Sequence, residues 1–436
     1  MSLSTEQLFA FKKWKEGNNI FISGPGGCGK THFIKYLNNH SDGKKIQICA
    51  MTGCAALLLG CNSKTLHSFT GIQLGNGSVD DIVNKIKRKY HLVQNWRKID
   101  CLVVDEVSMM SKSLLELLDT IAKKIRNNSR MFGGIQLVFS GDFFQLPPPN
   151  DENFCFESPL WFKLFPKDSH FIFSTIFRQK DLEFQNLLNQ VRIGNLDKKN
   201  EKILQSYVGR SIQNNIQPVQ LFPKKYMVNY INNHIYSKIN KIEKKYNLKI
   251  IENCDTYIEN NKPIPEKIII SCQKISKKEK ENEIRSLIYN SNWENSLFLK
   301  KGTIVMCTFN IDLKKGICNG SQGIITDFQD DYPIVRFFNG VTRKIDYQQI
   351  QSEKYPTLCI SHLPLCHSWA MTIHKIQGST LDCAEIDIGE QIFTYGQTYV
   401  ALSRLKSFDG LFLKNFSKKN IVANPKVSNF YKLFDF

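Results

Sequence analysis

The 436 residues are too many for one compact core and predict two or three domains, and 42% hydrophobic with 22% charged residues is typical of a globular protein. Lys and Arg outnumber Asp and Glu by 58 to 40, and the formal net charge of +18 favours an anionic partner such as nucleic acid or acidic lipid. The alternative explanation is a lysine-rich surface encoded by an AT-rich genome.

Neither the N-terminal sequence nor the spacing of the cysteines indicates a secreted protein. The segment MSLSTEQLFAFKKWKEG lacks the apolar core and cleavage site of a signal peptide, and the uncharged run 46–63 fits a strand followed by a short helix better than a membrane span. The 13 cysteines include no C-x-x-C pair. We therefore expect an intracellular protein of a reducing compartment, nucleus or cytoplasm, with no membrane partner. Four cysteines within apolar runs are expected to be buried hydrophobic residues rather than zinc ligands: Cys49, Cys101, Cys307 and Cys383.

Alternating strands and helices are predicted for the first 175 residues. Short apolar runs bounded by turn residues recur as NIFISG, IQICAM, CLVVDE, IQLVFSGD and FIFST. Helical patterns lie between them, the clearest being SLLELLDTIAKKI at 113–125. This alternation predicts an α/β fold with a parallel sheet covered by helices on both faces.

The stretch GPGGCGKT follows the first of these strands and begins the helix THFIKYL, as the G-x-x-x-x-G-K-[ST] phosphate-binding motif requires. Lys30 is expected to reach the β and γ phosphates, and Thr31 to ligate Mg²⁺. The sequence therefore predicts a nucleotide site whose loop consists of Gly24, Pro25, Gly26, Gly27, Cys28, Gly29, Lys30 and Thr31.

Two further motifs end at neighbouring strand tips. CLVVDEVS places Asp105, a candidate metal ligand, beside Glu106, a candidate general base, and the glutamate favours hydrolysis over nucleotide storage. LVFSGDFFQLPPP places Gln145 where a polar side chain can sense a γ-phosphate. A solvated acidic turn and a turn-capping glutamine are the alternative interpretations.

The chain changes character between about 200 and 300, where it is rich in Lys, Asn, Ile and Glu and only weakly periodic, so mobile or irregular surface is predicted. A second set of apolar strands follows: TIVMCT, GIITDF, PIVRFF, AEIDIG and GLFLKNF. The run 317–350 predicts a small antiparallel barrel or hairpin module.

Phosphoryl transfer also needs positive charge on the phosphate oxygens. Arg178 in STIFRQ and Arg404 in TYVALSR are the candidate arginine fingers, although an arginine chosen at random is usually a surface residue. An arginine from a second domain would put the nucleotide between two domains.

Taken in order, these motifs together with MTGCAALLLGCNSKTLHSFTGIQLG, NGSQGIITDF and LPLCHSWAMTIHKIQGSTLD resemble the petite-integration-frequency (Pif) helicases of superfamily 1, group B, relatives of RecD. The resemblance extends from LSTEQ at 3–7 to Phe416. It implies two RecA-like P-loop domains with a small β-barrel inserted in the second, and ATP-driven 5′ to 3′ translocation along single-stranded DNA.

The resemblance also implies roles and boundaries. Gln7 would bind the adenine edge, and Gly378 would approach the nucleotide from the second domain. The first domain would span 1–175 with a wedge near 70–98, the second 176–312 and 358–436, and the barrel 313–357. DNA contacts would come from Thr52, Gly53, His67, Phe144, Thr372, His374 and Lys375.

The expected enzyme is an ATP- and Mg²⁺-dependent DNA helicase acting in replication, repair or recombination, as a monomer on single-stranded or forked DNA. Two alternatives stay open. One is an ATP-regulated single-stranded DNA binding protein that does not unwind, and the other is a P-loop kinase of small molecules, which the charge of +18 disfavours.

Overall fold

The structure is a computed structural model that describes residues 3–72, 78–149, 151–211, 218–258, 261–291, 293–312, 315–317, 319–352 and 354–434. It divides into two compact units. Unit 1 comprises residues 1–211, 373–378 and 383–436, and unit 2 comprises residues 212–372 and 379–382.

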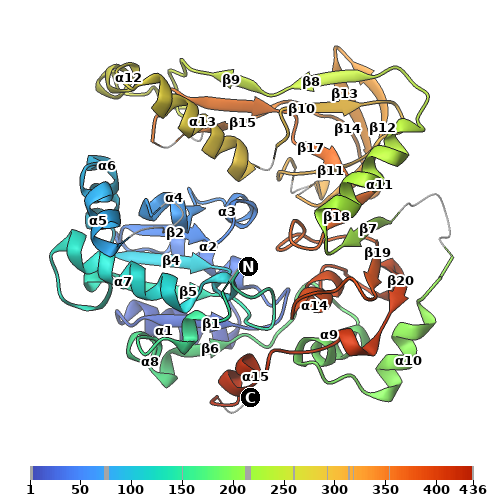
Figure 1. Cartoon of the computed structure of the whole chain (residues 1–436), viewed down its shortest axis with the longest axis horizontal. Coiled ribbons are helices and arrows are strands. Elements are labelled where there is room, and N and C mark those ends of the chain that lie inside the picture. The colour runs from blue at the N-terminus through green and yellow to red at the C-terminus, as the bar shows by residue number, and fades with distance from the viewer. Residues whose placement is uncertain are drawn as a thin grey trace. The chain divides into compact units, whose positions relative to one another are not determined.

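A six-stranded sheet in the order β3-β2-β4-β5-β1-β6 forms the centre of unit 1, and every strand pair in it is parallel (Figure 1). The parallel sheet predicted for the first 175 residues is therefore confirmed. Its central strands read as continuous apolar runs because both of their faces are buried. The strands are β1 (Ile20–Ser23), β2 (Ile46–Ala50), β3 (Lys64–Thr65), β4 (Cys101–Asp105), β5 (Gln136–Ser140) and β6 (His170–Ile172).

Helices pack on both faces of this sheet. Alternate residues of β1 divide between two hydrophobic cores, with Phe21 in one and both Ile20 and Ile22 in the other, because successive side chains of a strand point to opposite faces. The helix predicted at 113–125 is α7. The helices of the first 211 residues are α1 (Thr5–Lys15), α2 (Lys30–Asn39), α3 (Gly53–Leu59), α4 (Leu66–Thr70), α5 (Val79–Lys87), α6 (Tyr90–Lys98), α7 (Lys112–Arg126), α8 (Trp161–Leu164), α9 (Leu182–Ile193) and α10 (Lys198–Ser206).

Unit 1 also contains residues 383–436. Strands β19 (Ala384–Ile388) and β20 (Leu411–Phe416) pair in parallel, and helices α14 (Gln397–Leu402) and α15 (Pro425–Tyr431) complete the segment. This grouping differs from the predicted boundary at 175, and the division into domains at that residue stays a prediction.

The segment predicted as a wedge near 70–98 contains α5 and α6, apart from residues 73–77, which lie outside the described residues. Ser78 caps α5 by accepting a hydrogen bond from the amide of Asp81. The buried Trp96 of α6 donates from Nε1 to the carbonyl of Thr70 over 3.1 Å, which attaches α6 to α4. The wedge role stays a prediction.

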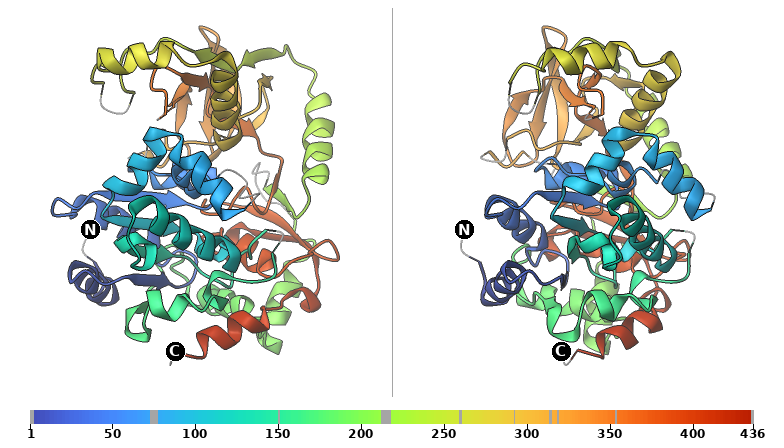
Figure 2. Two further views of the ribbon diagram at one scale, coloured as in Figure 1. Left: turned by 60° about the vertical axis from the view of Figure 1, so that its left-hand side comes forward. Right: turned by 90° about the vertical axis from the view of Figure 1, so that its left-hand side faces the viewer.

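Within the described residues, unit 2 is built mainly from antiparallel strands, and β18 and β7 pair in parallel. Figure 2 shows its yellow helices α12 and α13 beside its orange strands. Its elements are β7 (Val219–Phe222), α11 (Lys225–Ser237), β8 (Lys244–Asn247), β9 (Lys249–Ile251), α12 (Glu266–Gln273), α13 (Lys277–Ser291), β10 (Ser296–Leu299), β11 (Ile304–Cys307), β12 (Gln322–Gln329), β13 (Tyr332–Phe337), β14 (Thr342–Lys344), β15 (Gln348–Gln351), β16 (Cys359–His362), β17 (Leu365–His367) and β18 (Ala370–Thr372).

The antiparallel module predicted at 317–350 is present and larger than expected. Strands β12, β13 and β14 belong to a sheet of order β14-β13-β12-β11-β17, so strands on both sides of the predicted insertion 313–357 extend it. Residues 313, 314, 318 and 353 lie outside the described residues. Closure of this sheet into a barrel stays a prediction.

The prediction of irregular surface between about 200 and 300 is wrong. That part of the chain contains α11, α12, α13 and strands β7 to β10. Strand β8 pairs with β10, 49 residues later at Asn247 and Ser296, and β9 pairs with β16. These elements bury few side chains: within the described residues, β9 has no buried position and α12 buries Cys272 alone, so the sequence carries little of the apolar periodicity that reveals a strand or helix.

Candidate functional site

Eight residues between β1 and α2, Gly24 to Thr31, form a compact loop. Gly27 and Gly29 both have φ of 88°, in the left-handed region that favours glycine, and a Cβ on Gly27 would lie 2.6 Å from Cβ of Arg178. Helix α2 begins at Lys30, so its first amides have no partner within the helix and face the loop. A loop of this kind presents N–H groups and the positive end of a helix to an anion.

The Lys30 ammonium lies against this loop. It donates to the carbonyls of Gly24 at 2.6 Å and Pro25 at 3.0 Å. On the other side of the loop, the amide of Gly26 donates to the hydroxyl of Tyr399 at 2.8 Å. Tyr399 was not predicted, because a tyrosine 373 residues away in the sequence carries no local signal of this contact.

Asp105 and Glu106 follow β4 at the carboxyl edge of the sheet. Asp105 is buried and its Oδ1 accepts a hydrogen bond of 2.8 Å from Ser140 at the end of β5. Glu106 has φ 57° and ψ 40°, a left-handed conformation that turns its side chain away from the strand direction. Burial raises the pKa of both carboxyls, and for Glu106 the neighbouring Asp105 adds to the rise, to about 7.

The positive groups predicted to serve the site lie near Glu106. Lys30 and Arg404 both oppose the rise in the Glu106 pKa. The side chain of Gln377 donates from Nε2 to Oε2 of Glu106 at 3.1 Å. Sequence reasoning missed Gln377, although it immediately precedes Gly378 in HKIQGST, a motif already selected for its resemblance.

Both candidate arginine fingers lie in unit 1 with the loop. Arg404 is buried, donates to the carbonyl of Val400 and to Oγ of Ser403 at 2.9 Å each, and its Nη2 lies 3.3 Å from the position of a Cβ on Gly26. Arg178 donates to the carbonyl of Ser403 at 2.8 Å. Burial, with the adjacent Arg404, lowers the Arg178 pKa to about 9. Two guanidinium groups are thus held close together beside the loop.

Gln145 lies three residues beyond Asp142 in the loop after β5. It is buried, and within the described chain its Oε1 has no hydrogen-bond partner. Gly396, with φ 77°, lies so close that any Cβ there would overlap the carbonyl of Gln145. A buried amide oxygen without a partner is unusual and is consistent with a group that bonds to a ligand.

Gln7, a residue of α1, lies beside the Gly24–Thr31 loop. Its Oε1 accepts from the amide of Ser4 at 3.0 Å, and its Nε2 is buried without a partner in the described chain. That Nε2 lies 2.9 Å from the position of a Cβ on Gly29, and the exposed ring of Phe177 borders the same point. A donor of this kind fits the edge of a nucleotide base. Gly378 has φ 82° and lies beside Leu58 of α3, and its approach to the nucleotide stays a prediction.

The residues predicted to contact DNA are dispersed. Thr52 caps α3, Gly53 is its first residue, and His67 lies in α4, so all three follow the carboxyl ends of β2 and β3. His374 and Lys375 are exposed in unit 1, and the His374 ring stacks on Phe393 at 6.4 Å. Thr372 is buried in β18 of unit 2.

Phe144 differs from expectation. It is 8% exposed, and its ring stacks on Tyr431 with centroids 5.0 Å apart. The guanidinium of Arg192 covers the ring at 4.7 Å. The stacking partners of Phe144 in this structure are therefore protein groups, and a base could take their place only if Tyr431 moved.

These groups fit a magnesium nucleotide. Asp105 and Thr31 offer hard oxygen ligands, which Mg²⁺ prefers, and the Thr31 side chain is exposed beside the loop. Bound Mg²⁺ would neutralise charge on phosphate oxygens. Within the described residues, no cluster of three or more His, Cys, Asp or Glu side chains suits a metal, and the four cysteines predicted to be buried are buried. The same part of the chain contains no helix long and apolar enough to cross a bilayer.

Comparison with known proteins gives two family matches. Residues 2–202 match the model described as PIF1-like helicase, and residues 285–328 match DNA helicase Pif1, 2B domain. An uncharacterized protein, 030L, of Invertebrate iridescent virus 6 is 30% identical over 98% of this chain and 94% of its own length. The ATP-dependent DNA helicase PIF1 of Danio rerio is 31% identical over 99% of this chain and 64% of its own length. The chain thus spans slightly less than two thirds of that helicase.

Solved structures agree with the sequence comparisons. The crystal structure of Pif1 helicase from Candida albicans is 32% identical, with a TM-score of 0.77 and full coverage of both chains. Bacteroides sp Pif1 in complex with ADP-AlF4 is 27% identical, with a TM-score of 0.79 over 100% of this chain and 97% of its own. A further structure, with 27% identity and a TM-score of 0.65 over 100% of this chain and 97% of its own, concerns unwinding of forked duplex DNA by two coordinating Pif1 helicases. The predicted α/β fold with two RecA-like domains is confirmed by these likenesses.

Proposed function

The chain belongs to the PIF1-like helicase family, and on that premise we propose that it hydrolyses ATP at the Gly24–Thr31 loop and uses the energy to move 5′ to 3′ along single-stranded DNA and unwind duplex DNA. The observation that carries this proposal is the position of Glu106. It is a carboxylate of raised pKa, held by Gln377, with Lys30 and Arg404 close by. A nucleotide-storage protein has no need of such a base.

Each residue of the site has a proposed role in hydrolysis. Lys30 and the amides of the loop bind the β and γ phosphates, while Thr31 and Asp105 hold Mg²⁺. Glu106 accepts a proton from the attacking water, Gln145 bonds to the γ-phosphate, and Arg404 and Arg178 stabilise negative charge that develops on its oxygens. Gln7 binds the base edge, and Gly378 approaches the nucleotide.

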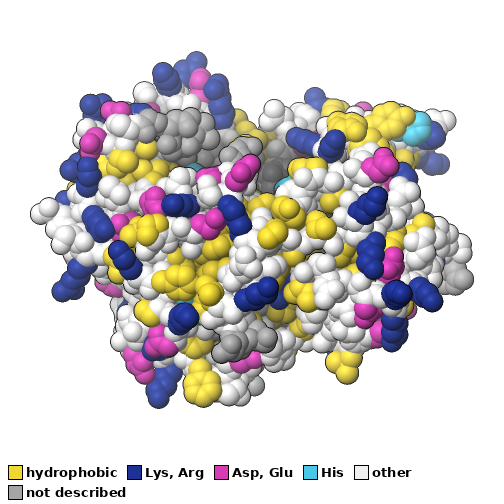
Figure 3. Space-filling view, turned by 60° about the horizontal axis from the view of Figure 1, so that its bottom comes forward, with side chains coloured by type: hydrophobic (Ala, Val, Ile, Leu, Met, Phe, Trp, Pro, Cys, Tyr) yellow, Lys and Arg dark blue, Asp and Glu magenta, His cyan; other side chains and the backbone are white. Residues whose placement is uncertain are grey.

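The proposed partner is single-stranded and forked DNA, in replication, repair, recombination or telomere maintenance. The net charge of +18 supports an anionic partner, and on the face shown in Figure 3 the basic side chains are spread among acidic ones rather than gathered in one patch. Separating one base pair costs about 1.4 kcal/mol on average, so the energy needed per step is small. Thr52, Gly53, His67, Phe144, Thr372, His374 and Lys375 are the proposed contacts.

The finer architecture is proposed as well. The wedge near 70–98, the barrel at 313–357 and action as a monomer on DNA are proposed from the family resemblance. Residence in the nucleus or cytoplasm is proposed from the cysteine pattern and the lack of a signal-peptide pattern. The unwinding function itself can be tested without them.

Strand displacement with 5′-tailed and 3′-tailed duplexes tests activity and direction together. The proposal requires ATP-dependent displacement of the 5′-tailed substrate and ATPase activity that rises with single-stranded DNA. ATP-sensitive DNA binding with no displacement and no stimulated turnover would instead identify a DNA clamp. Turnover indifferent to DNA, with no salt-dependent DNA binding, would identify a small-molecule kinase.

A further inference from the structure

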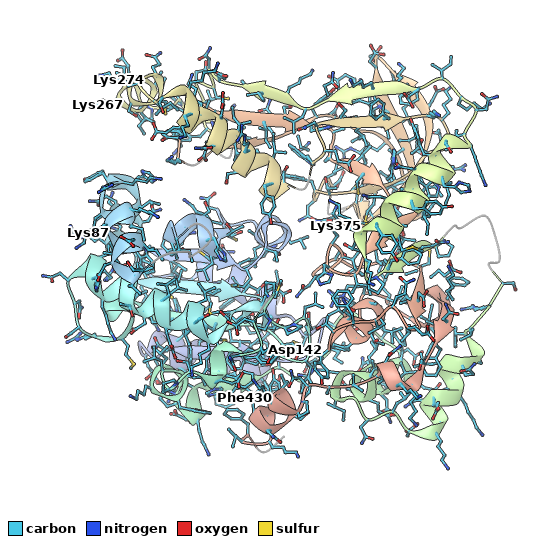
Figure 4. The ribbon with its side chains drawn as sticks, in the orientation of Figure 1. Lys87, Asp142, Lys267, Lys274, Lys375 and Phe430 are labelled. Carbon is cyan, nitrogen blue, oxygen red and sulfur yellow. The ribbon has the colours of Figure 1, made fainter. Side chains whose placement is uncertain are left out.

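Helix α15 packs against the loop that contains Gln145. Phe430 of α15 stacks on Phe156 with centroids 4.4 Å apart and meets Phe143 edge-on at 5.4 Å. Figure 4 labels Phe430 on α15 and Asp142 in the loop. Helix α15 begins well defined, because Asn424 caps it and Pro425 occupies its first turn. A segment some 280 residues after the loop therefore supports it.

The hydroxyl of Tyr431, at the end of α15, joins two parts of the proposed ATPase site. It lies 2.5 Å from Oγ of Ser23 and accepts a hydrogen bond of 3.2 Å from the amide of Phe143. Ser23 is the last residue of β1 and directly precedes the phosphate-binding loop. Phe143 lies two residues before Gln145. One buried hydroxyl thus connects the strand that leads into the phosphate-binding loop with the loop that carries the sensor.

The Tyr431 ring makes a second connection to the same loop. It stacks on Phe144 at 5.0 Å with only 12° between the ring planes. Arg192 lies over both rings, 4.7 Å from Phe144 and 5.5 Å from Tyr431, and binds Asp142 through two hydrogen bonds of 2.8 and 2.9 Å. Residues 142 to 144 of the loop are therefore held by contacts with Arg192 and Tyr431, which lie outside the loop. Oε1 of the next residue, Gln145, has no partner within the described chain.

We propose that Tyr431 is a positioning residue for ATP hydrolysis, which holds the Gln145 loop at a set distance from the phosphate-binding loop. This inference rests on the proposed ATPase function. The ring of Tyr431 fixes the position of the loop by stacking on Phe144. The hydroxyl of Tyr431 fixes the distance between this loop and the end of β1, because it bonds to both Ser23 and the Phe143 amide. Tyr431 itself touches no nucleotide, so its effect appears in turnover rather than in ATP affinity.

Tyr431→Phe removes the hydroxyl and keeps the stacked ring. At saturating ATP and single-stranded DNA we expect kcat to fall roughly three- to thirtyfold, the range that loss of one to two buried hydrogen bonds produces, because the variant loses the bonds to both Ser23 and the Phe143 amide. KM for ATP should stay within about twofold. Ser23→Ala should lower kcat in the same direction. Because both variants break the same connection, the double variant should be no slower than Tyr431→Phe alone.

Two controls separate positioning from general destabilisation. Phe434→Leu, at a buried ring that stacks on His170 at 4.3 Å, should lower the melting temperature but keep wild-type kcat at a temperature where the variant is folded. Lys432→Ala, at an exposed residue of the same segment, should change neither quantity. Wild-type kcat in Tyr431→Phe, or effects of Ser23→Ala and Tyr431→Phe that multiply, would overturn the inference while leaving the helicase proposal intact. An inactive wild-type protein would overturn the helicase proposal first, and this inference with it.

Discussion

Gln377 donates a hydrogen bond of 3.1 Å from Nε2 to Oε2 of Glu106. The two residues are 271 positions apart in the sequence, yet this contact is what orients the proposed general base. An amide that donates to a carboxylate favours its charged form and restricts its rotamer. The segment 373–378 thus contacts the proposed general base, in addition to containing the proposed DNA contacts His374 and Lys375.

Gln377→Ala should therefore slow ATP hydrolysis without preventing nucleotide binding. We expect kcat to fall about tenfold, because the base loses its orienting donor, with little change in the affinity for a nonhydrolysable ATP analogue. Steady-state ATPase assays and fluorescence titration measure the two quantities. Gln205→Ala, at an exposed glutamine of α10 in unit 1, is the matched control. A rise in KM with unchanged kcat would show that Gln377 acts on binding instead.

Glu106→Gln keeps the shape of the side chain and removes the proton acceptor. We expect kcat to fall by about 10² to 10⁴, the range typical of lost general-base catalysis, and the variant to stay bound to both ATP and DNA. Filter binding with labelled ATP and single-stranded DNA detects this trapped state. Undiminished turnover would place the base at another residue.

Arg404→Ala and Arg178→Ala test the two arginines separately. Both arginines border the loop, but Arg404 does so through its guanidinium, with Nη2 3.3 Å from the position of a Cβ on Gly26, whereas Arg178 does so through its Cβ at Gly27 and gives its Nη1 to the carbonyl of Ser403. We therefore expect the larger loss at Arg404. The loss should be about 10³ or more in kcat, the lower end of what an arginine finger contributes. Lys419→Ala, at an exposed position, should leave turnover unchanged. Equal small losses in both variants would argue against a finger role for either.

The buried ion pair between Arg192 and Asp142 should matter for stability. Asp142 is fully buried, so Arg192→Met leaves an unpaired buried charge, which costs about 3–5 kcal/mol. We expect the melting temperature to fall by roughly 5–10 °C in differential scanning fluorimetry. The exposed ion pair between Lys199 and Glu183 serves as the comparison. Lys199→Ala should change the melting temperature little. Similar shifts in both variants would contradict the argument.

His170 should make stability depend on pH. Its Nε2 accepts a hydrogen bond of 3.1 Å from Nε1 of Trp161, which requires a neutral ring, and burial lowers its pKa to about 4 from the ordinary value of 6.5. Between these two values the unfolded chain binds a proton that the folded chain does not, so stability falls as the pH falls through this window. Urea denaturation at pH 7.5 and 5 should show a smaller loss in His170→Gln than in wild type. His40→Gln, at an exposed histidine, should show the wild-type loss.

Local patterns predicted the phosphate-binding side of the site well. The loop at Gly24, the strand before Asp105 and the helix at 112–126 all depend on neighbours within a few residues, so periodicity and motif spacing reveal them. The same reasoning failed for about 200–300, where elements such as β9 and α12 bury few side chains and so show little periodicity. The DNA contact at Phe144 came from the family resemblance and stays a prediction, and in the structure the Phe144 ring stacks on Tyr431.

The amino-acid sequence by itself indicated a phosphate-binding loop, proposed which side chains serve it, and determined that the first domain alternates strands and helices, because each of these follows from residue type at short spacing. Only the tertiary structure decided what holds those side chains in place. Gln377 on Glu106, Tyr399 on Gly26 and Tyr431 between Ser23 and Phe143 are contacts between residues more than 250 positions apart. Such contacts arise from the packing of whole elements, which buries the apolar faces of α14 and α15 and brings along polar groups that no local pattern could pair.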